Sequence, residues 1–325
     1  MTSQLPDGPA AGAAVSVRDL RKSYGSLEAL RGVSFDIERG ETFALLGPNG
    51  AGKSSTIEIL EGYRDRSGGF ASVLGVDPHR GGVEWKARLG IVLQSGAEAA
   101  DVTVREQVAH FARFYPRPRD VDEVISAVGL TDKAKTRIRN LSGGQRRRLD
   151  VALGVVGRPE LLFLDEPTTG FDPEARHEFW DLIRGLKREG TTILLTTHYL
   201  DEAAQLSDRV AVIARGTLVD IGAVDAIGDA SARVPIVRWR DSAGRPRSER
   251  SETPGAVVAR LIAELGTEPR NLEVIRPSLE DIYLELVRET DTAIDPMTSA
   301  AESGSAAEGG GRRSSRHSAT EGDRA

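Results

Sequence analysis

The sequence predicts an α/β domain built on a largely parallel sheet, with a small α+β domain after it. Between about residues 15 and 229, apolar strand-like runs alternate with amphipathic runs of helical spacing, a pattern typical of parallel sheets covered by helices. From 230 to 289 two strand-like runs enclose one helix, and a second helix follows. Residues 1–14 are expected to be loose. Residues 290–325 are expected to be a disordered tail, because they cannot bury enough apolar surface to fold.

Within the first domain, residues 97–150 are expected to form a helical insert, because they contain no strong strand-like run. Apolar side chains recur there at helical spacing in two places, and Gly129 is placed to end the second helix. The two sets are Val104, Val108, Phe111 and Tyr115, and Val121, Val124, Ile125 and Val128.

Composition excludes several classes of protein. The 325 residues carry a net charge of −6, which gives no reason to expect nucleic acid as a partner. There is no cysteine, so disulfides and cysteine-bound zinc are excluded. No apolar run approaches the roughly 18 residues of a transmembrane helix, and residues 1–14 lack the features of a signal peptide. If the chain serves a membrane process, we expect another chain to span the membrane.

A phosphate-binding loop of the pattern G-x-x-x-x-G-K-[ST] is matched by Gly-Pro-Asn-Gly-Ala-Gly-Lys-Ser at residues 47–54. The loop lies between a strand-like run, 42–46, and a helix-like run, 55–60, which is the context that the pattern requires. Its glycines let backbone N–H groups turn around an anion at a helix N-terminus. We expect Lys53 to reach the outer phosphates of a nucleotide and Ser54 to ligate Mg²⁺.

Two carboxylates, Asp165 and Glu166, end an apolar run that starts at Leu161. In open α/β sheets ligands bind at the carboxyl ends of the strands. With a phosphate loop in the same domain, we expect Asp165 to bind Mg²⁺ through water and Glu166 to polarise the attacking water. Without that loop, two acids solvating a strand end would be the simpler interpretation.

Two more polar residues follow strand-like runs. His198 comes directly after 192–197, and Gln94 after 91–93. At such a strand end His198 would reach a γ-phosphate, while Gln94 would offer its carbonyl to Mg²⁺ and its amide to the attacking water. Each residue by itself has an ordinary structural or surface role as its alternative interpretation.

The stretch Leu-Ser-Gly-Gly-Gln at 141–145 opens a helix. Ser142 is suited to be the N-cap of that helix, and the arginines at 146–148 are expected to form a solvated face. The two glycines at a helix start also make a second anion-binding site.

In this order, the phosphate loop, Gln94, the Leu-Ser-Gly-Gly-Gln stretch, the paired carboxylates and His198 resemble the nucleotide-binding subunit of an ATP-binding-cassette (ABC) transporter. The resemblance covers about 15–228, and residues 170–173 match the D-loop of the family, with Phe171 where leucine is commoner. It implies a RecA-like core with an antiparallel β part and a helical subdomain. The ATP-binding positions that it implies are Tyr24, Gly47, Pro48, Asn49, Gly50, Ala51, Gly52, Lys53, Ser54, Ser55, Ser142, Gly143, Gly144, Gln145 and Asp172.

The resemblance further implies Glu166, His198 and Gln94 as catalytic residues, and Ser54, Gln94 and Asp165 as Mg²⁺ ligands. Cassettes of this family form head-to-tail homodimers, in which Lys53, Ser54 and Ser55 of one subunit and the Ser-Gly-Gly of the other enclose each ATP. A separate membrane permease is the implied partner, which would place the chain at the cytoplasmic face of the membrane.

Two stretches resemble the ABC-2-type, drug-export subfamily, which includes daunorubicin-type resistance exporters: Thr-Thr-His-Tyr-Leu-Asp-Glu-Ala at 196–203 and Pro-Ser-Leu-Glu-Asp-Ile-Tyr-Leu-Glu-Leu at 277–286. They imply export of a drug, antibiotic or lipid-like substrate. The second stretch is also readable as an amphipathic helix, because its apolar residues share one face. The small C-terminal domain of this subfamily is expected to help hold the dimer together.

Two other functions remain possible for a cassette of this kind. One is a soluble ATPase that acts on nucleic acid or ribosomes, but the tandem cassettes, zinc modules and basic extensions usual in that class are not seen in this acidic chain. The other is a non-hydrolysing regulatory subunit, which usually lacks the residue equivalent to Glu166 or to His198. This chain has both.

Overall fold

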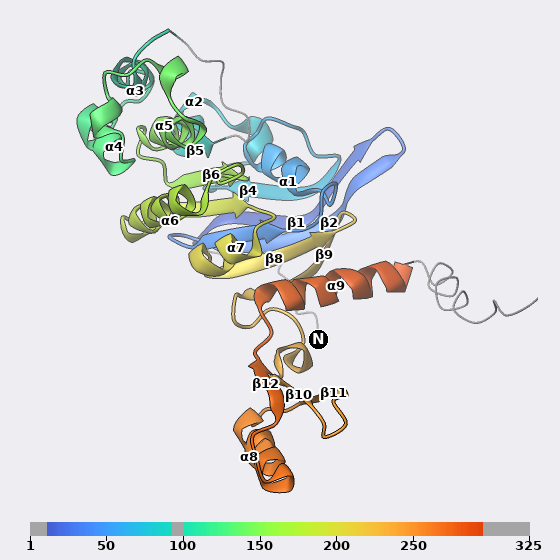
Figure 1. The fold of residues 1–325 in the computed structure, drawn as a ribbon. Helices are drawn as coiled ribbons and strands as arrows, with labels where there is room; N and C mark the ends of the chain where they lie inside the picture. Colours follow the sequence, from blue (N-terminus) through green and yellow to red (C-terminus); the bar gives the residue numbers. More distant parts are fainter. Residues whose placement is uncertain (1–11, 93–100, 295–325) are drawn as a thin grey trace, which may run out of the picture. The chain divides into compact units, whose positions relative to one another are not determined.

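The computed structural model describes residues 12–92 and 101–294. Its main element is a six-stranded sheet with strand order β5-β6-β7-β3-β8-β9. Neighbouring strands from β5 to β8 are parallel, and β9 is antiparallel to β8, which confirms the predicted α/β class (Figure 1). The strands are β3 (Thr42–Leu46), β5 (Leu89–Val92), β6 (Leu161–Asp165), β7 (Thr192–Thr196), β8 (Arg209–Ala214) and β9 (Thr217–Ala223).

Both faces of this sheet are buried. Side chains of successive residues in a strand point to opposite faces, so each strand contributes to both buried clusters. In β3, Phe43 and Leu45 belong to one buried cluster, while Ala44 and Leu46 belong to the other. Burial on both sides explains why the parallel strands appear in the sequence as continuous apolar runs.

One face is covered by a three-stranded antiparallel sheet, of order β2-β1-β4, together with helix α1. Phe35 of β2 stacks on Phe43 of β3 with ring centroids 5.4 Å apart. Strand β1 begins at Ala13, so the last two residues of the segment expected to be loose, 13 and 14, belong to a strand. The elements here are β1 (Ala13–Tyr24), β2 (Leu27–Glu38), β4 (Gly68–Val73), α1 (Lys53–Leu60) and α2 (Val83–Lys86).

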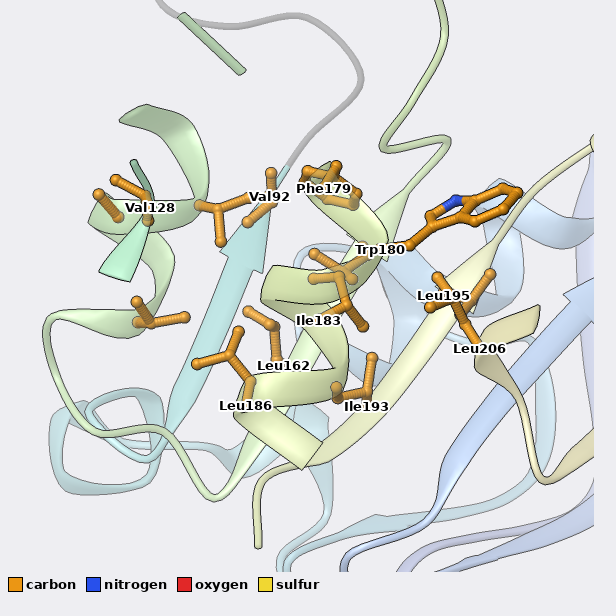
Figure 2. Packing of buried hydrophobic residues seen from close by; sticks show 14 of the residues in the cluster. Val92, Val128, Leu162, Phe179, Trp180, Ile183, Leu186, Ile193, Leu195 and Leu206 are labelled. Atoms are coloured by element: carbon orange, nitrogen blue, oxygen red, sulfur yellow. The ribbon is translucent and has the colours of Figure 1, made fainter. Parts of the chain in front are cut away.

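The other face is covered by α6 (Pro173–Arg188) and α7 (Leu200–Leu206). Apolar residues of α6 recur at intervals of three and four, so they form one stripe along the helix. Figure 2 shows the packing at this face of Phe179, Trp180, Ile183 and Leu186 of α6, Leu162 of β6, Ile193 and Leu195 of β7, and Leu206 of α7.

The predicted helical insert contains α3 (Val104–Ala112), α4 (Val121–Ala127) and α5 (Gly143–Val155), which contact one another (Figure 1). Helix α3 starts with a capping box, in which the Thr103 hydroxyl accepts from the Glu106 N–H and the Glu106 carboxylate accepts from the Thr103 N–H. Short 3₁₀ turns lie at Pro78–Arg80, Thr131–Lys133, Ile138–Asn140 and Ala230–Arg233.

The C-terminal part has a second antiparallel sheet, of order β11-β10-β12, with a small core of Val237, Val257 and Leu261. Strand β11 lies in a stretch that the sequence indicated only as polar, because four of its five side chains are exposed. The elements are β10 (Ile236–Arg240), β11 (Pro246–Arg250), α8 (Pro254–Leu265), β12 (Arg270–Ile275) and α9 (Leu279–Ile294).

Residues up to Val287 belong to one compact unit, and Arg288 begins a second. Helix α9 continues to Ile294, past the position where the sequence indicated that the tail begins. In the described ranges, none of the helices is both long and apolar enough to cross a bilayer.

Candidate nucleotide-binding site

A cavity of about 710 Å³ lies where β3, β6 and β7 end. These strands are parallel neighbours, so the segments that follow them meet at one edge of the sheet. The volume is typical of a site for a small organic molecule. The lining residues are Tyr24, Leu27, Ala29, Gly47, Pro48, Asn49, Gly50, Gly52, Lys53, Ser54, Ser55, Glu166, Thr197, His198, Leu200 and Tyr283.

The path of the loop at 47–54 depends on glycine. A Cβ atom at Gly47 would lie 2.2 Å from the carbonyl oxygen of Ile213, and one at Gly52 would lie 2.6 Å from the Leu30 side chain. Gly52 also has a φ of 107°, which is strained for any residue with a Cβ. The loop therefore lies against β2 and β8 with its backbone close to the cavity, as an anion-binding loop requires.

Lys53, the first residue of α1, is buried beneath this loop. Its Nζ donates to the carbonyl oxygens of Gly47 at 2.7 Å and Pro48 at 3.2 Å. Burial lowers the pKa of Lys53, while the charges of Glu166 and Asp165 favour its protonated form. The Lys53 ammonium group is thus held at the cavity by hydrogen bonds to two carbonyl oxygens. A bound phosphate would accept these hydrogen bonds in their place.

The two carboxylates at the end of β6 have different environments. The Asp165 Oδ1 accepts from the Thr196 hydroxyl at 2.5 Å, which fixes the carboxylate against β7. Glu166 lines the cavity, and its N–H donates to the Thr196 carbonyl at 3.1 Å. Its φ of 43° is unusual for a residue with a side chain. This turn sends the chain out of the strand at the edge where Glu166 reaches the cavity.

His198 lies beside Glu166, with 3.4 Å between its Nδ1 and the Glu166 Oε2. The imidazole is 43% exposed and its ring centroid is 4.1 Å from that of Tyr199. The buried Thr197 holds the turn, because its hydroxyl accepts from the Tyr199 N–H at 2.9 Å. The structure thus brings together at the cavity the carboxylate and the histidine that the sequence indicated.

Tyr24, the last residue of β1, also lines the cavity. Its hydroxyl is 3.1 Å from the Ser55 hydroxyl, so the two side chains form a hydrogen bond. The Lys22 ammonium and the Arg64 guanidinium lie 5.0 and 5.3 Å from the ring centroid, within the range of cation–π attraction.

The residues at 142–145 are not brought into the cavity. The hydroxyl of Ser142 and the side chain of Gln145 form a capping box at the start of α5, which confirms Ser142 as an N-cap. A Cβ at Gly143 would have no neighbour within 4 Å, so Gly143 faces open space, while one at Gly144 would contact only Ala175 at 3.8 Å. This stretch is an exposed helix start in the single chain.

Three other predicted residues also lie outside the set that lines the cavity. Asp172 caps α6, where its Oδ1 accepts from the Ala175 N–H at 2.8 Å. Ala51 is buried and Asp165 is half-buried, and neither lines the cavity. Gln94 falls outside the described residues.

The expectation of a solvated arginine face at 146–148 is wrong for Arg147. This side chain is 7% exposed, and it donates to the carbonyl oxygens of Pro167 at 2.9 Å and Asp165 at 2.8 Å. Three consecutive arginines on a helix cannot all face one way, because successive residues are about 100° apart. Arg147 is thus the residue through which α5 holds the segment that follows β6.

Sequence patterns missed three features of this region. Leu200 and Tyr283 line the cavity, although apolar residues on helices are ordinarily read as core. Glu61, the C-cap of α1, is buried. Burial raises the pKa of its carboxyl to about 8, and the charge of Asp165 adds to the effect. No local signal marks these residues, because their surroundings come from segments distant in sequence.

A glycine loop with a buried lysine, at the edge of a parallel sheet and beside a strand-end carboxylate, defines a P-loop nucleotide-binding protein. A model of the ABC transporter family matches residues 30–169. The chain is 34% identical to the daunorubicin resistance ATP-binding protein DrrA3 of Streptomyces coeruleorubidus, over 84% of this chain and 95% of that protein. It is 35% identical to the Nod factor export ATP-binding protein I of Rhizobium johnstonii, over 86% and 97% of the two chains.

The structure is similar to that of cbiO1 from Clostridium perfringens, described as part of an ABC transporter complex, with a TM-score of 0.60 and 30% identity over 65% of this chain and 89% of that one. The chain therefore belongs to the ABC transporter family, as an ATP-binding and ATP-hydrolysing subunit of the type found in drug-resistance and export systems.

Proposed function

We propose that this chain energises a separate membrane permease by binding and hydrolysing ATP as a head-to-tail homodimer. The observation that carries the proposal is the division of the predicted site. The phosphate loop, Glu166 and His198 share one cavity, while the residues at 142–145 do not line it, and Ser142 and Gly143 are exposed. A second copy is the natural source of the missing half, because it presents the same exposed helix start.

Each cavity residue has a role that fits its position. We propose that Tyr24 stacks on the adenine, and that the loop N–H groups, Lys53 and Ser55 bind the phosphates. In a head-to-tail dimer the helix start at 142–145 of the partner would cap the γ-phosphate, with Asp172 at the same interface.

We propose that Glu166 accepts a proton from the attacking water. As the water oxygen bonds to the γ-phosphorus, the bond from that phosphorus to the β,γ-bridging oxygen breaks, and ADP and inorganic phosphate are the products. His198, beside Glu166, would contact the γ-phosphate. Gln94 remains a proposed contact for the water, since it falls outside the described residues.

The oxygens of Ser54, Asp165 and Gln94 are the proposed ligands of Mg²⁺. Hydroxyl, carboxylate and amide oxygens suit this ion when phosphates and water complete its shell. Within the described ranges, no group of three histidine or acidic side chains is placed to hold a metal ion. When bound, Mg²⁺ would neutralise charge on the phosphates.

The direction of transport and the substrate class are proposed from the relatives. Proteins named for daunorubicin resistance and for Nod factor export match nearly the whole of their lengths. We propose export of a drug, antibiotic or lipid-like substrate, with the chain held at the cytoplasmic face of the membrane by the permease. The stretch 230–289 is proposed as a small C-terminal domain.

The proposal is tested by recovery of the partner. Tagged Glu166→Gln protein, which is expected to keep ATP bound, is incubated with ATP and detergent-solubilised membranes of the source organism, and co-purified proteins are identified by mass spectrometry. We expect a multi-span permease, enriched over the same experiment with Lys53→Ala protein. Recovery of ribosomal or nucleic-acid-binding proteins without a permease would contradict the proposal.

A further inference from the structure

Helix α9 begins with a well-defined cap. The hydroxyl of Ser278 accepts from the Asp281 N–H at 3.2 Å, and the Asp281 carboxylate accepts from the Ser278 N–H and hydroxyl, both at 2.8 Å. This reciprocal arrangement fixes where the helix starts. It also sets which side chains of α9 share a face, since those at intervals of three and four lie together.

One residue of α9, Ile282, packs against the cassette. It is 4% exposed and belongs to the same buried cluster as Ile227 and Ala232. A Cβ placed on Gly228 would lie 2.4 Å from the Ile282 Cγ2, so the helix lies directly on the backbone of that glycine. Any larger residue at Gly228 would push the helix away.

The backbone under Ile282 is itself fixed. The Gly228 N–H donates to the Asp220 carboxylate at 2.6 Å, and the Arg233 guanidinium donates to the carbonyl oxygens of Ile227 and Gly228. Since a charged donor or acceptor makes each of these hydrogen bonds, they are stronger than neutral ones. The contact surface for α9 is therefore a rigid part of the cassette.

The next residue, Tyr283, lines the nucleotide cavity, as do His198 and Leu200. Burial raises the pKa of its phenol, so the ring is neutral at physiological pH. Aromatic rings of this kind give large apolar contact with little loss of side-chain entropy. Its neighbour Leu284 is 42% exposed and is not among the cavity residues.

We propose that Tyr283 contacts the bound adenine nucleotide, so that nucleotide occupancy and the docking of α9 on the cassette stabilise each other. This inference rests on the proposed nucleotide site. A ligand that touches Tyr283 binds more tightly when α9 is docked, and by linkage it holds α9 in place. The docking of α9, which contains most of the 277–286 stretch, thereby depends on whether nucleotide is bound, and the helix transmits this state to the C-terminal part of the chain.

The test is the affinity of the full-length chain for a fluorescent N-methylanthraniloyl ATP with Mg²⁺. In Tyr283→Ala the Kd is expected to rise about 3- to 10-fold, as for loss of one aromatic contact of about 1 kcal/mol. In Leu284→Ala, the matched control on the same helix, it is expected to stay within about twofold of wild type. An unchanged Kd in Tyr283→Ala would overturn the inference.

Hydrogen exchange of the wild-type chain gives a test that needs no variant to fold. Peptides within 279–287 are expected to exchange more slowly when ATP analogue and Mg²⁺ are added, and equal exchange would also overturn the inference. Lys53→Ala separates the two proposals. If Lys53→Ala still binds nucleotide, the proposed nucleotide site is wrong. If Lys53→Ala loses nucleotide binding while Tyr283→Ala binds as tightly as wild type, only the role of α9 is rejected.

Discussion

At the scale of residues, the chemistry depends on how the chain leaves β6. Glu166 has a left-handed backbone conformation, which a residue with a side chain adopts at a cost of about 1–3 kcal/mol. The conformation is held by the Glu166 N–H, which donates to Thr196 of the neighbouring strand. Strain held by neighbouring strands is typical of functional positions, and here it turns the acid toward the cavity while Asp165 stays against β7.

Replacing Glu166 by glutamine keeps the shape of the side chain and removes its capacity to accept a proton. Steady-state phosphate release is expected to fall about 100-fold or more, the usual contribution of a general base, while the Kd for nucleotide stays within about twofold. Glu174→Gln, at an exposed acid in the first turn of α6, is the control and is expected to retain turnover. Wild-type turnover in Glu166→Gln would contradict the assignment of the base.

At the scale of elements, Glu160 ties together the start of the parallel sheet. It precedes β6 and accepts from Arg88 at 2.6 Å and from Arg39 at 2.8 Å, so it joins the segments that precede β5 and β3. The hydrogen bond from Arg88, followed by that from Arg39, lowers the pKa of Glu160 to about 2. The group is partly exposed, so solvent screening limits its contribution to roughly 1 kcal/mol.

The pH dependence of this ion pair follows from the lowered pKa. The stabilisation is fully present above the unfolded-state pKa of about 4.5 and is lost as the pH falls toward 2. In urea unfolding, Glu160→Gln is therefore expected to be less stable than wild type by about 1 kcal/mol at pH 7, with a smaller difference at pH 3.5.

Glu252→Gln is the control for this prediction, because Glu252 is exposed and makes no ion pair with the residues that the structure describes. It is expected to change stability little at either pH. If the free energies of unfolding of Glu160→Gln and wild type differ by the same amount at pH 7 and at pH 3.5, the role of the ion pair is contradicted.

Most elements could be predicted from local patterns, and the exceptions have physical causes. The parallel strands are buried on both faces, so each appeared as an apolar run between turn residues. Strand β11 lacks that signal, because its burial is slight. The orientation of Arg147 depends on carbonyl groups at Asp165 and Pro167, which no pattern within α5 shows.

The same distinction holds for the site. The phosphate loop, Glu166 and His198 each follow a strand and Asp165 ends one, and parallel pairing alone brings strand ends together. Tyr283 reaches the cavity only because α9 packs on Gly228, a contact between segments more than 50 residues apart in sequence. Spacing within a helix indicates which residues share a face, but not which surface that face meets.

At the scale of the whole molecule, the proposed site is completed by a second copy of the chain. In one chain the cavity has the phosphate loop and the acid, while the helix start at 142–145 does not line it and Gly143 faces open space. ATP bound to one subunit would supply the charge that the partner's helix N-terminus attracts. Loss of the γ-phosphate would remove much of that attraction, so the proposed dimer is expected to be held by ATP and not by ADP.

The most direct test of this claim is the mass of Glu166→Gln protein in solution, measured by light scattering after gel filtration. With ATP and Mg²⁺ the mass is expected to double from that of the 34.9 kDa chain, and with ADP it is expected to remain that of the monomer. In Glu166→Gln/Gly143→Asp the added carboxylate occupies open space, so the fold is retained while the charge repels the partner's ATP. That variant is expected to bind ATP as a monomer. A Glu166→Gln protein that is saturated with ATP and still monomeric would contradict the composite site, as would a dimer that forms equally with ADP.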